Sequence, residues 1–121
     1  MKTGLIIINH GSRAKEANKV FDMIVEMINN RINYDQVRGA AMELTEPPLN
    51  ETVKQMADKG VEKIIVIPLF LFPGVHIQRD IPELISQMED KYPEIKIVLG
   101  DNIGAHHKIV DILEEKIREV E

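Results

Sequence analysis

Residues 5–12 of the chain are Leu5-Ile6-Ile7-Ile8-Asn9-His10-Gly11-Ser12. Four apolar residues without polar alternation predict a short strand that is buried on both faces, as in parallel sheets covered by helices. A histidine stands where this strand should end. Residues 13–31 then place apolar side chains at helical spacing. We therefore expect a strand that turns at His10 into a helix capped by Ser12.

The same alternation of strand and helix continues to the end of the chain. Further strands are predicted at residues 37–44, 64–67 and 95–99. Helices are predicted at 49–57, from a capping box formed by Asp80 and Glu83 onward, and at 109–120. The order βαβαβαβα predicts an α/β fold in which residues 1–121 form a single domain. Its four-stranded parallel sheet should carry helices on both faces, like the βα repeats of flavodoxin.

Composition narrows the possible functions. The 121 residues include no cysteine, which excludes disulfides, thiolate metal sites and cysteine nucleophiles, so that a metal must be held by His, Asp, Glu or water. The net charge of -5 argues against nucleic-acid binding, which needs a basic face. No apolar run is long enough to span a membrane, and the N-terminus does not resemble a signal peptide. We expect a cytoplasmic protein.

Four side chains are predicted to meet at one edge of the sheet. Ligands of parallel α/β sheets bind outside the carboxyl ends of the strands. His10 follows the first strand, Glu43 and Glu46 follow the second, and His76 lies in the loop after the third. Two imidazoles and a carboxylate can bind a divalent first-row metal, leave positions open for another ligand, and move protons near neutral pH.

Other interpretations of these segments are weaker. The turn at residues 9–13 precedes a helix as phosphate-binding loops do, yet it matches neither glycine-rich phosphate motif. A Ser12 nucleophile with His10 as its base is disfavoured, because residues two apart in a tight turn rarely reach that geometry. His106 and His107 are neighbours at the start of the last helix and point about 100° apart, so they are interpreted as surface or helix-start residues.

The segment 69–75 is apolar where an exposed loop would normally be polar. Two of the three phenylalanines of the chain, Phe70 and Phe72, lie in it. Core packing beneath a long loop would explain this composition. A wall for a large flat ligand, or for a second subunit, would explain it equally.

Three segments together resemble a known family. Asn9-His10-Gly11-Ser12-Arg13, the stretch 43–49 (ELTEPPL) and the stretch 68–82 (PLFLFPGVHIQRDIP) are similar to the small class II tetrapyrrole chelatases. The resemblance is to sirohydrochlorin cobalt and nickel chelatases, close to the sirohydrochlorin ferrochelatases. It covers nearly the whole chain, and the length matches the short archaeal form.

The resemblance implies an enzyme that inserts a divalent metal into sirohydrochlorin without an organic cofactor, in cobalamin or nickel-tetrapyrrole biosynthesis. It implies a homodimer whose subunits imitate the two halves of longer chelatases. By position, His10 is a metal ligand and proton acceptor, His76 is the second metal ligand, and Glu43 is the acidic residue between them. Substrate-contacting positions are implied at Glu46 and at Leu71, Phe72, Pro73, Gly74, Val75 and His76.

The residues are consistent with that reaction. Two pyrrole protons must leave the ring as the metal enters, and a neutral histidine beside a carboxylate can accept one. Sirohydrochlorin carries many carboxylates, so Arg13, Lys15 and Arg79 are candidate cations for them. Imidazole binds Co²⁺, Ni²⁺ and Fe²⁺ in a graded series, which leaves the metal open. A ferrochelatase, a non-catalytic metal or tetrapyrrole carrier, and a flavodoxin-like phosphate-binding module remain as alternatives.

Overall fold

The computed structural model describes residues 1–43 and 45–121, and for residues 75–77 it describes the backbone alone. Its elements alternate along the chain in the predicted order. They are β1 (Thr3–Asn9), α1 (Lys15–Asn29), β2 (Gln36–Ala41), α2 (Leu49–Asp58), β3 (Lys63–Pro68), α3 (Val75–Lys91), β4 (Lys96–Leu99) and α4 (His107–Val120). The α/β prediction is confirmed.

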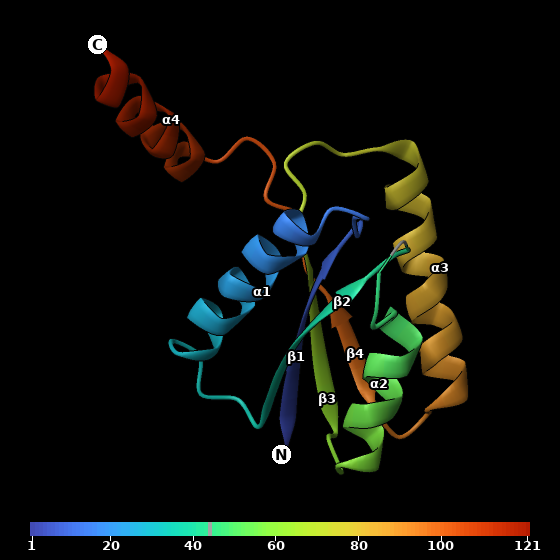
Figure 1. The fold of residues 1–121 in the computed structure, drawn as a ribbon. Coiled ribbons are helices and arrows are strands. Elements are labelled where there is room, and N and C mark those ends of the chain that lie inside the picture. The colour runs from blue at the N-terminus through green and yellow to red at the C-terminus, as the bar shows by residue number, and fades with distance from the viewer. Residues whose placement is uncertain (44) are drawn as a thin grey trace.

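The four strands form one parallel sheet in the order β2-β1-β3-β4. Along the chain, the step from β1 to β2 goes toward one side edge of the sheet, whereas the steps from β2 to β3 and from β3 to β4 go toward the other side edge. Right-handed crossovers therefore place α1 on one face and both α2 and α3 on the opposite face. Figure 1 shows this arrangement, with all four strands ending at the same edge.

The larger core lies between the sheet and the pair α2 and α3. Alternate residues of the central strands point there and are completely buried: Ile6, Ile8, Ile64 and Val66. The intervening residues Leu5 and Ile7 face α1, where they form a smaller cluster with Phe21. Burial on both faces explains the unbroken apolar run of β1.

Two predicted helix starts are wrong. α1 begins after Ala14, and the Ser12 Oγ accepts a hydrogen bond from the Ala14 N–H instead of capping the helix. α3 begins at Val75, with Gly74 as its N-cap residue, so Asp80 and Glu83 lie inside the helix and form no capping box. Pro82 is interior too. As a result the backbone of His76 lies in the first turn of α3 rather than in a loop.

The last helix differs from the other three. None of its side chains is buried, and Figure 1 shows α4 extending away from the sheet beyond its carboxyl edge. No helix among the described residues is long and apolar enough to cross a membrane.

Candidate active site

His10 and Glu43 meet at the carboxyl edge, as predicted. β1 and β2 are hydrogen-bonded neighbours, and two backbone bonds continue beyond their ends, from Met42 N–H to Asn9 C=O (2.9 Å) and from Glu43 N–H to His10 C=O (3.0 Å). The side chains then approach until His10 Nε2 lies 3.1 Å from Glu43 Oε1. This distance permits a hydrogen bond, and it permits an ion pair when the imidazole is protonated.

Gly11 makes this approach possible. Its φ of +97° is a conformation that L side chains rarely adopt. A Cβ at this position would lie 1.8 Å from the Glu43 carbonyl oxygen. The chain can therefore turn beside the end of β2 only because residue 11 lacks a side chain.

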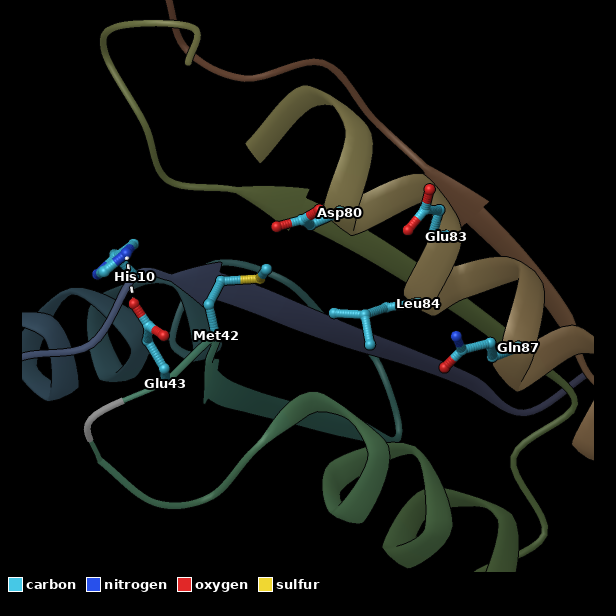
Figure 2. A pocket seen from close by; sticks show the side chains of 7 residues that line it. All are labelled: His10, Met42, Glu43, Asp80, Glu83, Leu84 and Gln87. Atoms are coloured by element: carbon cyan, nitrogen blue, oxygen red, sulfur yellow. Dashed lines mark ion pairs between the residues drawn. The ribbon is translucent and has the colours of Figure 1, made fainter. Parts of the chain in front are cut away.

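A pocket of about 250 Å³ opens beside the pair. His10, Met42 and Glu43 form one side of it, and α3 supplies Asp80, Glu83, Leu84 and Gln87 on the other. Figure 2 shows the two groups facing each other, with the paired His10 and Glu43 at one end and Asp80 opposite. His10 and Glu43 remain 45% and 56% exposed, so an ion or a ring in solution can reach them.

Asp80 and Glu83 were not predicted as site residues. Their spacing with Leu84 and Gln87 places all four on one face of a helix that begins at Val75. The signal was present in the sequence, but Pro82 favoured a later helix start, which made Asp80 and Glu83 a cap. Their carboxylates give the α3 side of the pocket an acidic character.

The other predicted residues are distributed along the same edge. Glu46 lines a separate cavity of about 120 Å³ on the α1 side, with Asn18 and Asp22. Pro73 lines a third pocket, of about 200 Å³, together with residues of α3 and of the segment that follows β4. Leu71 and Phe72 are exposed, Phe72 to 83%. Arg13, Lys15 and Arg79 are exposed and do not line the His10 pocket.

The side chain of His76, the second predicted metal ligand, is not among those that the structure describes. The same holds for Val75, and only their backbone can be placed. Among the side chains that the structure does describe, no group of three or more His, Asp or Glu is arranged to hold a metal ion. The described site is therefore an imidazole–carboxylate pair beside an acidic pocket.

His106 and His107 lie at the start of α4, as predicted. His106 is the N-cap residue, and its Nδ1 accepts a hydrogen bond from the Lys108 N–H. The two rings stack with centroids 4.4 Å apart. Capping accounts for His106 without a role in metal binding.

Comparison with known proteins identifies the family. The CbiX family model matches residues 4–120, so the chain belongs to the CbiX family. It is 32% identical over 115 residues to a chloroplastic sirohydrochlorin ferrochelatase of Arabidopsis thaliana, covering 95% of this chain and 51% of that protein. It is 31% identical over 135 residues to a sirohydrochlorin cobaltochelatase of Methanopyrus kandleri, covering 95% of this chain and 94% of that protein.

Solved structures agree with this assignment. A CbiX protein of cobalamin biosynthesis from Marinobacter aquaeolei superposes with a TM-score of 0.84 at 29% identity, over 97% of this chain and 95% of that one. The sirohydrochlorin chelatase SirB from Bacillus subtilis, in complex with cobalt, superposes with a TM-score of 0.92 at 28% identity, over 99% of this chain. Only 51% of the SirB chain is covered, so this chain spans about half of its length.

Proposed function

We propose that this protein is a sirohydrochlorin chelatase, which inserts a divalent metal ion into the ring. The observation that carries the proposal is the His10–Glu43 pair, 3.1 Å apart and half-exposed at the carboxyl edge of a CbiX-family sheet. Relatives of similar length from several archaea are named sirohydrochlorin cobaltochelatases. The alternative of a phosphate-binding module has no comparable support.

The pair is suited to taking a proton from the ring. Each metal that enters displaces two pyrrole protons, and the lone pair on a neutral His10 can accept one. The Glu43 carboxylate then stabilises the imidazolium, because the two groups are already within hydrogen-bond distance. Their exposure lets the proton pass on to water, which restores the neutral imidazole for the next proton.

We further propose that His10 and His76 hold the incoming metal. Position 76 is four residues before Asp80 in α3, and residues four apart on a helix share a face. Asp80 and Glu83 line the same pocket and can attract a cation toward it. Two imidazoles with water bind a metal loosely enough for four ring nitrogens to take it.

The metal itself is a substrate in this reaction. Co²⁺ and Ni²⁺ are the ions we propose, with Fe²⁺ as the alternative. Related proteins are named for cobalt and for iron, and Ni²⁺ is proposed because imidazole binds it as well. No organic cofactor is required, because proton and metal transfer need none. We also propose that the protein works in the cytoplasm as a homodimer, with the exposed Leu71–Phe72 segment and Glu46 contacting the ring.

The first prediction concerns the two histidines. His10→Ala and His76→Ala should each lower the rate of metal insertion at least about 100-fold, the usual effect of losing a group that transfers protons. Glu43→Gln should lower it less, because His10 remains. Insertion is followed by the change in absorbance of sirohydrochlorin with Co²⁺, Ni²⁺ or Fe²⁺ over multiple turnovers.

His107→Ala is the matched control, since it removes a histidine away from the pocket and should leave the rate unchanged. Circular dichroism should show an intact fold in all four variants. A His76→Ala variant with full activity would refute the two-histidine mechanism. Formation of a single equivalent of product without turnover would instead identify a carrier.

A further inference from the structure

The pocket beside the His10–Glu43 pair is too small to enclose a tetrapyrrole. Its volume is about 250 Å³, whereas pockets that enclose drug-sized ligands, which are smaller than sirohydrochlorin, measure about 300–1,000 Å³. A divalent ion with a full shell of six waters fills only about 180 Å³, at about 30 Å³ for each water. By its size, the pocket admits a hydrated metal ion and cannot hold the ring.

The charge of the lining favours the same occupant. The carboxylates of Glu43, Asp80 and Glu83 line the pocket, and no lysine or arginine among the described residues does. Such a lining repels sirohydrochlorin, which carries many carboxylates, and attracts a metal cation. A cleft lined by charge of one sign raises the rate at which an oppositely charged ligand arrives, by about 10- to 1,000-fold.

α3 gives the pocket a direction. The helix begins near the carboxyl edge and runs back along the sheet (Figure 1), so that Gln87 lies about 10 Å behind Asp80 along the helix axis. Glu83 and Gln87 are exposed, whereas Asp80 is half-buried. Figure 2 shows Asp80 opposite the His10–Glu43 pair, with Glu83 and Gln87 farther along α3. The pocket therefore leads from an exposed end at Glu83 to the pair at the edge of the sheet.

The lining attracts a cation without chelating it. Met42 and Leu84, the two apolar side chains of the pocket, lie between its ends (Figure 2). Among the side chains that the structure describes, no three His, Asp or Glu are arranged to hold a metal ion. A closed set of protein ligands would retain the ion, whereas a metal that is to be transferred needs an open one. The lining is thus suited to the passage of an ion rather than to its storage.

We propose that this pocket is the entry route of the metal ion, while the ring binds at the carboxyl edge against the exposed Leu71–Phe72 segment. Glu83 is then the first carboxylate that the hydrated cation meets, and it determines how readily the protein captures metal. The ion can reach His10 after the ring is in place, so neither substrate blocks the other. This inference rests on the proposed chelatase function and adds to it a route and a metal-capturing residue.

The first test removes the charge of Glu83 and keeps the size of its side chain. Glu83→Gln should raise the KM for Co²⁺ about 10-fold at low ionic strength, and leave kcat and the KM for sirohydrochlorin unchanged. Since salt screens the attraction between exposed charges, the difference from the wild-type protein should shrink at about 0.5 M salt. A merely structural effect of the substitution would not depend on salt in this way.

Glu89→Gln is the matched control for this test. It makes the same change of charge at another exposed position of α3, which does not line the pocket. The KM for Co²⁺ should remain that of the wild-type protein. An unchanged KM in Glu83→Gln, or an equal rise in Glu89→Gln, overturns the proposal.

The second test asks whether the ring and the metal share one entrance. The protein is saturated with sirohydrochlorin and then mixed with Co²⁺, which is kept in excess over the ring. Separate routes predict a rate of insertion that stays constant as the ring concentration is raised beyond saturation. A shared entrance predicts that additional ring slows insertion, because it blocks the path of the metal, and this result would also overturn the proposal.

Binding of Co²⁺ without the ring is measured separately, by stopped-flow recording of its visible absorbance. The bound ion should form more slowly in Glu83→Gln than in Glu89→Gln. If that difference is found in a protein that never metallates sirohydrochlorin, the entry route is supported and the proposed function alone is refuted. Equal rates of binding in the two variants would overturn the route whatever the activity.

Discussion

At the scale of single residues, the candidate site depends on the absence of a side chain at residue 11. The Glu43 carbonyl occupies the space where a Cβ would stand. The conformation is also one that a non-glycine residue adopts at a cost of about 1–3 kcal/mol. Both effects act on the segment that places His10 against Glu43. Stability and activity should therefore change together at this position.

Gly11→Ala should lower the free energy of unfolding by more than about 3 kcal/mol, because the clash adds to the strain. It should also lower metal insertion by displacing His10 from Glu43. Urea unfolding and the absorbance assay measure the two effects.

Gly60→Ala separates strain from clash. Gly60 also has a positive φ, of +80°, but the nearest atoms to its Cβ are 3.9 Å away, at the end of Lys2. This variant should lose only about 1–2 kcal/mol of stability and retain full activity. Equal losses in the two variants would contradict the role assigned to the Glu43 carbonyl.

At the scale of elements, α3 contains a residue that helices normally exclude. Pro82 is the eighth residue of the helix, so it lacks an N–H that should bond within the helix. Its side chain is exposed, which means that little packing offsets the loss. The helix nevertheless continues, since Ile81, Ile85 and Met88 are buried against the sheet and α2.

Pro82→Ala should raise the free energy of unfolding by about 1–3 kcal/mol, given the poor tolerance of helix interiors for proline. Pro93, in the connection between α3 and β4, is the control. Pro93→Ala should lower stability by about 0.4–1 kcal/mol, because it frees the unfolded chain. Denaturant unfolding of both variants checks the opposite signs, and a loss of stability in Pro82→Ala would contradict the argument.

Pro82 also explains why the start of α3 could not be predicted from the sequence, whereas the strands could. Apolar runs such as 5–8 and 64–67 identified the strands, because burial on both faces leaves no polar alternation. The alternation of strands and helices also predicted that His10 and Glu43 lie at the same edge of the sheet, and their side chains meet there. The pattern places the start of α3 six residues late, with Asp80 instead of Gly74 as the N-cap residue, since a proline followed by Glu83 is typical of a first helical turn. The packing of Ile81 and Ile85 decides otherwise, and no local pattern expresses that packing.

Because of the late start, the residues that α3 contributes to the pocket were not predicted as site residues. In a helix that starts at Val75, Asp80 shares a face with Glu83 and Gln87, whereas as an N-cap residue it would stand at the end of the helix. The departure of α4 was likewise not predictable. Its apolar stripe indicates that it packs on something, but periodicity does not say which sheet.

At the scale of the whole molecule, two apolar surfaces of one chain lie apart. An apolar groove beside α1 is lined by Leu5, Ile7, Ile28, Ile32, Tyr34, Ile65 and Ile67, and α4 carries an exposed apolar stripe of Val110, Leu113, Ile117 and Val120. Association of two copies, as in the homodimer proposed above, would cover such surfaces. Folding stability is then linked to association, so it depends on protein concentration.

The thermal midpoint should accordingly rise by about 5 °C when the protein concentration is raised a hundredfold. Differential scanning calorimetry across that range measures the shift. The Leu113→Glu variant should show a midpoint that does not vary with concentration. A constant midpoint in the wild-type protein would mean that α4 contributes nothing to association.

The projecting helix also bears on how the protein is made in a cell. In a subunit that has not yet met a partner, the apolar stripe of α4 and the apolar groove beside α1 are both exposed to solvent. In a subunit without a partner, residues 100–106 would be accessible to proteases and the apolar groove would be accessible to chaperones. Unpaired subunits would therefore be degraded more readily than paired ones.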